Sequence, residues 1–297
     1  MPIPESQLEI WSHQGSITNS SNTYNAIKNV LEDSDAPYAD RRYEVYLQGS
    51  YGNSTNIWSE SDVDIVIQLN SIFSSDIENL SKSEKEAWDA AYLNGTYNNP
   101  EFKRDVLKVL TDAYGADVTS GDKAIAIAAR GNRRKADVIV ANAFRRYIKF
   151  NGMADESYVA GICFWNNAGT RIANYPKLHS SNLTVKHQAT GSWLKPVIRI
   201  FKNLRARLVD DGVLKAGVAP SYYLEGLLYN VPTDRFADSY ADCLVKSLNW
   251  IQQESVRSNL VCANEQYYLL RDGSLVCWTP AKAEAFLAAA IKLWNAW

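Results

Sequence analysis

The chain has 297 residues, 46% of them hydrophobic, and a formal net charge of -2 at pH 7. This length allows one large domain or two smaller ones with a substantial core. A protein that binds long DNA or RNA usually carries a strongly basic face. The near-neutral charge argues against such a protein, so we expect a small anionic substrate and no requirement for a long nucleic acid.

Cysteine and histidine are sparse and scattered. The chain has four cysteines, none of them paired as CxxC, and three histidines, a pattern that predicts neither a zinc knuckle nor a histidine-based site. Scattered thiols are typical of the reducing cytosol. The sequence shows no signal peptide and no apolar run near the roughly 20 residues that a membrane span requires. We therefore expect a cytoplasmic protein without a membrane partner.

The first half of the chain alternates between helical and strand-like patterns. Apolar spacing predicts helices at 22–34, 82–93 and 101–114. Alternating or continuous apolar residues predict strands at 43–48, 62–69, 123–129, 135–141 and 144–150. These elements indicate an α+β fold in which helices flank a mixed sheet.

The second half becomes helical from about residue 178. Helices are predicted at 192–210, 221–232, 239–254 and 281–297. We expect two domains, residues 1–175 and the helical residues 176–297, with the second domain closing a ligand cleft.

Two carboxylates share one face of the predicted strand 62–69. Asp62 and Asp64 are two residues apart, so their side chains point the same way, whereas the residues that alternate with them are aliphatic. Like charges this close repel unless a cation compensates them, and hard oxygen ligands suit Mg²⁺. Asp137, in the predicted strand 135–141, would join them if the two strands paired side by side. We expect these three aspartates to be metal ligands and catalytic residues.

Gly49 and Ser50 follow the predicted strand 43–48 and open a polar loop. Glycine lets backbone N–H groups approach phosphate oxygens closely, and the serine hydroxyl adds a donor. An ordinary loop is the alternative for this pair taken alone, just as an ordinary turn explains the Asp-x-Asp pair Asp33 and Asp35. With Asp62 a dozen residues further on, the pair favours phosphate binding.

Together, Gly49-Ser50, Asp62-Val63-Asp64 and Asp137 resemble the signature of DNA-polymerase-β-like nucleotidyltransferases. Three later segments resemble the bacterial cGAS/DncV-like nucleotidyltransferases (CD-NTases) and, by general similarity, their CdnE-like group: NYPKLH at 174–179, the basic helix Lys195–Arg207 and SYYLE at 221–225. Enzymes of that family make cyclic di- and oligonucleotide second messengers in anti-phage signalling (CBASS).

The resemblance implies a nucleotidyltransferase catalytic core in residues 1–175, NTP substrates and release of pyrophosphate. It also implies two Mg²⁺ ions, with Mn²⁺ as a substitute, that Asp62 and Asp64 bridge and Asp137 further ligates. Gly49 and Ser50 would hold the donor triphosphate. A downstream effector would sense the cyclic product.

The basic helix and the segment after it offer further contacts. Lys195, Arg199 and Lys202 are spaced to share one helical face. We expect Lys195 and Lys202 to contact phosphates, with a solvated face as the alternative. Ser221 could add a phosphate contact and Tyr222 could stack on a base, with core packing as the alternative for Tyr222.

Asn166 follows the strand-like segment 161–165 (GICFW). Its amide offers a donor and an acceptor that match a uracil edge, and an ordinary turn is the alternative. Together with the family resemblance, Asn166 predicts UTP as one substrate, with ATP as its partner.

Two other functions are compatible with the same residues. One is an RNA-terminal nucleotidyltransferase, which the modest charge and the lack of an RNA-binding module argue against. The other is a nucleotide-binding sensor without catalysis, for which a lost carboxylate is the expected mark, and all three aspartates are present.

Overall fold

The computed structural model describes residues 2–59, 62–93, 95–236 and 238–297. Its contacts divide the chain into two compact units. The sheet unit comprises 18–48 and 62–176, and the helical unit comprises 1–17, 49–61 and 177–297. Residues 1–17 and 49–61 therefore belong to the helical unit, although the division expected at residue 175 assigns them to the first domain.

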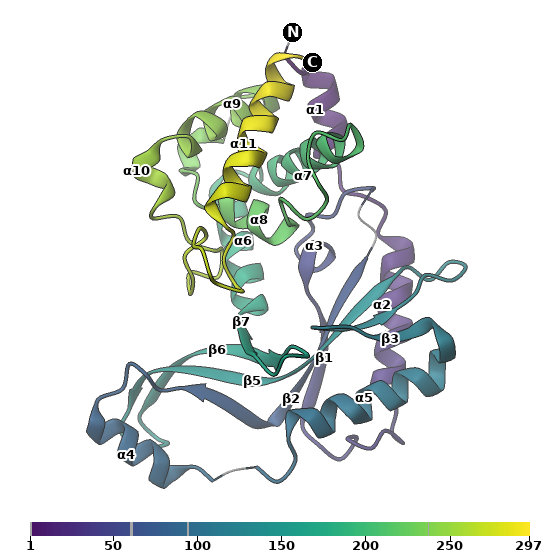
Figure 1. Cartoon of the computed structure of the whole chain (residues 1–297), viewed down its shortest axis with the longest axis vertical. Coiled ribbons are helices and arrows are strands. Elements are labelled where there is room, and N and C mark those ends of the chain that lie inside the picture. The colour runs from purple at the N-terminus through teal and green to yellow at the C-terminus, as the bar shows by residue number, and fades with distance from the viewer. Residues whose placement is uncertain (1, 60–61, 94, 237) are drawn as a thin grey trace. The chain divides into compact units, whose positions relative to one another are not determined.

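The sheet unit is built on a seven-stranded mixed sheet (Figure 1). Five strands are hydrogen-bonded in the order β1 (Tyr43–Leu47), β2 (Val63–Asp76), β5 (Ala136–Phe150), β4 (Ile125–Ile127) and β3 (Val118–Ser120). β6 (Glu156–Trp165) pairs with β5 and with β7 (Arg171–Asn174). β2 and β5 run parallel, and the other described pairs are antiparallel. The predicted mixed sheet is confirmed.

β5 corrects one sequence prediction, because the strands expected at 135–141 and 144–150 form one continuous strand. Asn142 interrupts the apolar pattern between them. Its side chain is nevertheless buried and accepts a hydrogen bond of 3.2 Å from the Asn99 side chain. A partner distant in sequence therefore satisfies this polar residue inside the strand.

Three helices belong to the sheet unit: α2 (Thr18–Leu31), α4 (Lys82–Ala91) and α5 (Asn99–Tyr114). α2 and α5 contact each other and the sheet, and both bury their apolar sides against β2 and β5. α4 and α5 each begin with a capping box, at Ser81 and Asn98, which satisfies backbone N–H groups that a helix start leaves unpaired.

The helical unit contains the remaining helices, which Figure 1 shows gathered around α7. These are α1 (Glu5–Ser12), α3 (Gly49–Gly52), α6 (Pro176–Ala189), α7 (Leu194–Asp210), α8 (Ser221–Tyr229), α9 (Tyr240–Ile251), α10 (Glu254–Arg257) and α11 (Pro280–Asn295). α7 contacts α1, α8, α9 and α11 and buries its aliphatic residues in their common core. The four predicted helices of this half are confirmed as α7, α8, α9 and α11.

The two ends of the chain pack together in the helical unit. The ring of Trp297 meets that of Trp11 edge-on, with 5.4 Å between centroids. The Arg207 guanidinium lies 5.7 Å from the Trp297 ring. Among the described helices, none is long and apolar enough to cross a bilayer.

Candidate active site

The strands that carry the three aspartates lie side by side in the sheet unit. β2 and β5 pair in parallel, with Asp64 and Asp137 as register partners. Asp62 comes one residue before β2 begins, on the same side of the strand as Asp64. The predicted pairing therefore places all three carboxylates at the starts of two neighbouring strands.

Burial distinguishes the two sides of β2 at this point. Val63 and Ile65, which alternate with the aspartates, are completely buried. The side chains of Asp62 and Asp137 keep 48% and 32% of their surface exposed. Further along the strand, both Val66 and Gln68 are buried, so buried residues separate the carboxylates at the start of β2 from its more accessible second half, residues 70–76.

A lysine that the sequence analysis did not single out contacts these carboxylates. The Lys135 ammonium lies 2.7 Å from Asp62 Oδ2 and 3.4 Å from Asp137 Oδ2. The hydrogen bond to Asp62 is the main cause that raises the pKa of Lys135 above its usual value. Lys135 precedes Asp137 by two residues and thus shares its side of the strand. This spacing could have indicated the contact from the sequence.

The donor chemistry of this group fits a divalent cation. Three carboxylates supply the hard oxygen ligands that Mg²⁺ prefers, and the Lys135 ammonium already places a positive charge against two of them. Within the described residues, no three Asp, Glu, His or Cys side chains are arranged as a ready metal site. By their donor chemistry, the three carboxylates are the residues that would hold such an ion.

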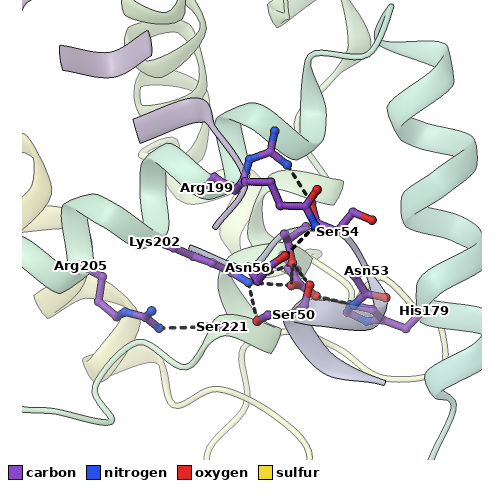
Figure 2. Close-up of polar contacts among 12 residues, drawn as sticks. Ser50, Asn53, Ser54, Asn56, His179, Arg199, Lys202, Arg205 and Ser221 are labelled. Atoms are coloured by element: carbon purple, nitrogen blue, oxygen red, sulfur yellow. Dashed lines mark hydrogen bonds and ion pairs between the residues drawn. The ribbon is translucent and has the colours of Figure 1, made fainter. Parts of the chain in front are cut away.

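Gly49 and Ser50 belong to the helical unit, in the segment 49–56 that contains α3. Gly49 adopts a φ of 65°, a conformation that glycine tolerates without strain. The Ser50 carbonyl accepts a hydrogen bond from the Thr55 N–H at 2.9 Å, which closes the segment on itself. Figure 2 shows the Lys202 ammonium donating to the Ser50 hydroxyl, at 2.7 Å. The structure thus brings together Ser50 and Lys202, two of the predicted phosphate contacts.

Lys202 lies inside the helical unit, not on a solvated face. Its side chain is 0% exposed, and its ammonium donates to Thr55 Oγ1 at 3.0 Å and to Glu225 Oε1 at 2.9 Å as well as to Ser50. Glu225 also accepts a hydrogen bond of 2.9 Å from Asn53 Nδ2. His179 Nε2 lies 2.8 Å from the same carboxylate. Segment 49–56, α6, α7 and α8 therefore meet around one buried ion pair.

The Glu225 carboxylate is held in its charged form. Burial alone raises the pKa of this group, but the Lys202 ammonium and the hydrogen bonds from His179 and Thr55 outweigh burial and keep the pKa below its usual value. The sequence analysis missed this residue as a site candidate. The available signal was an acid inside the apolar run of α8, because a buried charge requires partners.

The other predicted contacts of the helical unit have partners within that unit. Lys195 Nζ lies 3.4 Å from Thr184 Oγ1, and burial lowers the pKa of Lys195. The Ser221 hydroxyl accepts a hydrogen bond of 3.2 Å from Arg205 (Figure 2). Their roles as phosphate contacts stay predictions.

Tyr222 packs in the core of the helical unit, which was the alternative to base stacking. Its ring stacks on His179 with 4.7 Å between centroids, and its hydroxyl accepts a hydrogen bond of 2.8 Å from Asn264. The ring also packs against the core of the helical unit. Base stacking by Tyr222 stays a prediction.

Asn166 begins the turn between β6 and β7. Its side-chain oxygen accepts a hydrogen bond of 2.8 Å from the Thr170 N–H, as expected of a turn residue. Asn142 in β5 pairs with Cys163 in β6. The register of β5 and β6 ends at this pair, three residues before Asn166.

Comparisons with known proteins identify the family of this chain. Residues 181–295 match the profile of the cGAS/DncV-like nucleotidyltransferase C-terminal helical domain. A cyclic UMP-AMP synthase of Rhodothermus marinus is 40% identical over 100% of this chain and 99% of its own length. The cyclic nucleotide synthase CdnE01 of Staphylococcus haemolyticus is 36% identical over 100% of both chains. The solved structure of the Rhodothermus marinus CdnE c-UMP-AMP synthase with Apcpp and Upnpp has a TM-score of 0.89 and 38% identity, covering 100% of this chain and 98% of that one.

These similarities confirm the α+β nucleotidyltransferase fold with its C-terminal helical domain, and they confirm the enzyme class, a nucleotidyltransferase that makes cyclic nucleotides. The chain belongs to the cGAS/DncV-like nucleotidyltransferases.

Proposed function

We propose that this enzyme joins UTP and ATP into a cyclic dinucleotide that contains one uridine and one adenosine. The observation that carries the chemistry is the register of β2 and β5, because it sets Asp64 opposite Asp137 with Asp62 beside them. The choice of bases is supported by the 40% identity with the Rhodothermus marinus cyclic UMP-AMP synthase over the full chain.

The reaction forms two phosphodiester bonds in succession. A ribose hydroxyl oxygen of one nucleotide bonds to the α-phosphorus of the other, and its proton passes to solvent. The bond from that phosphorus to the oxygen bridging to the β-phosphorus breaks, and pyrophosphate leaves with the electron pair. Repeating the step with the hydroxyl of the second nucleotide closes the ring and releases a second pyrophosphate.

Enzymes of this family generally depend on divalent metal ions. We assign Asp62 and Asp64 to hold two Mg²⁺ ions and Asp137 to ligate one of them, with Mn²⁺ as a substitute. When bound, such ions lower the pKa of the attacking hydroxyl and neutralise charge on the leaving pyrophosphate. Lys135 would compensate the carboxylates until a metal ion arrives.

The substrate contacts follow from the chemistry of the side chains. Gly49 and Ser50 would bind the donor triphosphate, because Ser50 offers a hydroxyl close to a buried cation and Gly49 lets the backbone approach phosphate oxygens closely. Lys195 and Ser221 would add phosphate contacts, and Asn166 would read uracil. The cyclic product would act on a downstream effector in anti-phage signalling.

The direct test is mass spectrometry of the purified enzyme incubated with each pair of NTPs, with Mg²⁺ or with EDTA. A cyclic product that contains uridine and adenosine, formed only with Mg²⁺, is the expected result. Tailing of an added RNA without any cyclic product would instead indicate an RNA-terminal nucleotidyltransferase. The full-length similarity to cyclic nucleotide synthases argues against that outcome.

A further inference from the structure

We propose that Glu225 is a positioning residue that acts through Lys202 to orient the Ser50 hydroxyl as a hydrogen-bond donor to a bound triphosphate. The inference rests on the proposed function, which makes a nucleoside triphosphate the ligand of Ser50. It departs from the sequence prediction that the Lys202 ammonium itself contacts phosphate.

The hydrogen bonds of Lys202 show that its ammonium is engaged inside the protein. An ammonium has three N–H donors, and the described residues offer that of Lys202 an acceptor for each: Ser50 Oγ at 2.7 Å, Glu225 Oε1 at 2.9 Å and Thr55 Oγ1 at 3.0 Å. The side chain is 0% exposed. While these bonds hold, every N–H of the ammonium is engaged inside the protein, so Lys202 acts on a ligand through a neighbour.

Ser50 is that neighbour. Its hydroxyl oxygen accepts a hydrogen bond from the Lys202 ammonium, so the hydroxyl hydrogen points in another direction, where it can donate to an anionic oxygen. A positively charged donor also polarises the hydroxyl and strengthens the bond that it donates. The chain of bonds from Lys202 to Ser50 thus prepares a single oriented donor.

Glu225 fixes the position of this chain. Its Oε1 accepts from Lys202 and from the Thr55 hydroxyl, and its Oε2 accepts from Asn53 at 2.9 Å and contacts His179 Nε2 at 2.8 Å. Four donors match the roughly four acceptor positions of an ionised carboxylate. Because Asn53 and Thr55 belong to the same segment as Ser50, one side chain holds both the segment and the ammonium in place.

The variant Glu225→Gln disrupts this arrangement with a minimal change in shape. An amide replaces one pair of acceptor positions by two N–H donors, which would face donors already present, and it leaves the Lys202 charge buried without its counter-ion. We expect the affinity for Apcpp, measured by calorimetry with Mg²⁺, to fall about tenfold or more, since unsatisfied buried polar groups are costly. KM for NTP should rise by a similar factor, with a smaller change in kcat.

A double-mutant cycle with Ser50→Ala separates positioning from a general structural role. If Glu225 acts through the Ser50 hydroxyl, Glu225→Gln weakens Apcpp binding about tenfold in the presence of Ser50 and less than about twofold in the Ser50→Ala background. Equal losses in both backgrounds would overturn the inference. Thr55→Val, which is isosteric and removes the hydroxyl between Lys202 and Glu225, repeats the cycle should Glu225→Gln fail to fold.

Leu244→Ala serves as the matched control. Leu244 is fully buried in α9, in the core of the same unit, and it takes no part in the network around Glu225. This variant should lower the melting temperature while leaving Apcpp affinity unchanged. A wild-type enzyme that neither binds Apcpp nor forms a cyclic product would remove the proposed function. A wild-type enzyme that does both, with additive effects in the cycle, would remove the positioning role alone.

Discussion

Asp64 and Asp137 lie directly opposite each other across the parallel strands β2 and β5. Neighbouring strands lie about 4.8 Å apart, so the two carboxylates project from adjacent positions. Two elements far apart in the sequence therefore contribute to one group of carboxylates, and the group depends on strand pairing more than on any loop.

Replacing Asp62 and Asp64 by alanine should abolish cyclic product formation, with a loss of at least about 100-fold, because metal ions contribute several kcal/mol of charge stabilisation. The melting temperature without metal should change little, since Asp62 is half exposed. Product chromatography and a thermal melt measure the two effects. Asp35→Asn, in an exposed Asp-x-Asp pair of the same unit, is the matched control, and full turnover of the double alanine variant would contradict the assignment.

Lys135→Met should increase the affinity for Mg²⁺, because the ammonium that contacts Asp62 and Asp137 no longer competes with the ion. Since exposed ion pairs contribute about 0–1 kcal/mol, the gain should be about fivefold at most. The rise of melting temperature with Mg²⁺ concentration, without nucleotide, measures it. Lys149→Met, which removes an exposed ion pair between β5 and Asp155 in the turn after it, should leave the Mg²⁺ response unchanged. A lower Mg²⁺ affinity of Lys135→Met than of the wild type would contradict this prediction.

Asn166→Ser should reduce uridine incorporation about tenfold or more relative to total phosphodiester formation, because a site that has lost its base contacts discriminates poorly. Mass spectrometry of products from an equal mixture of the four NTPs gives both quantities. The neighbouring exposed Asn167→Ser is the control. Unchanged product ratios in Asn166→Ser would mean that Asn166 serves the turn alone.

The buried carboxylate of Glu225 should make stability depend on pH. Its pKa in the folded chain lies below the ordinary value of 4.5, so its stabilising contribution is complete above that value and is lost as the pH falls through the folded pKa. Urea unfolding at a series of pH values should show a smaller loss of stability in acid for Glu225→Gln than for the wild type. Glu254→Gln, at an exposed position of α10, should follow the wild type, and identical profiles for all three proteins would contradict the prediction.

Trp297→Ala should lower the free energy of unfolding because the edge-on contact with Trp11 is lost. This loss should be about 0.5–1.5 kcal/mol larger than the free energy due to the lost apolar burial alone. Urea titration measures this change. Leu275→Ala, at a side chain that is 55% exposed, is the control and should be nearly neutral. Equal stability of Trp297→Ala and the wild type would show that the packing of the two ends contributes nothing.

The carboxylate group could be predicted from the sequence because strand alternation is a local property. Val63 and Ile65 mark the buried side of β2, so the side of Asp62 and Asp64 follows without knowledge of the rest of the chain. The pairing with Asp137 remained conditional on the sequence alone, because β3 and β4 lie between β2 and β5 in the chain. Helices with regular apolar spacing, such as α7 and α11, were predictable for the same reason.

The network around Glu225 could not be predicted in this way. Its bonds to Asn53 and Thr55 join residues 172 and 170 positions apart, and no local pattern specifies such partners. The same limit explains why β5 was predicted as two strands. Asn142 interrupts the apolar pattern, and its hydrogen-bond partner Asn99 is distant in the sequence. Polar residues satisfied by tertiary contacts are the common cause of both errors.

β5 connects the carboxylate of Asp137 with the turn that contains Asn166. Asp137 lies near its start, and its later residues hold β6, whose end leads into the turn of Asn166. Residues 167–170 of that turn are exposed and belong to no strand, so their side chains do not take part in the sheet. If Asn166 reads the base, as proposed, substitutions in this turn would change which nucleotide is incorporated, while the strands that carry the aspartates stay the same.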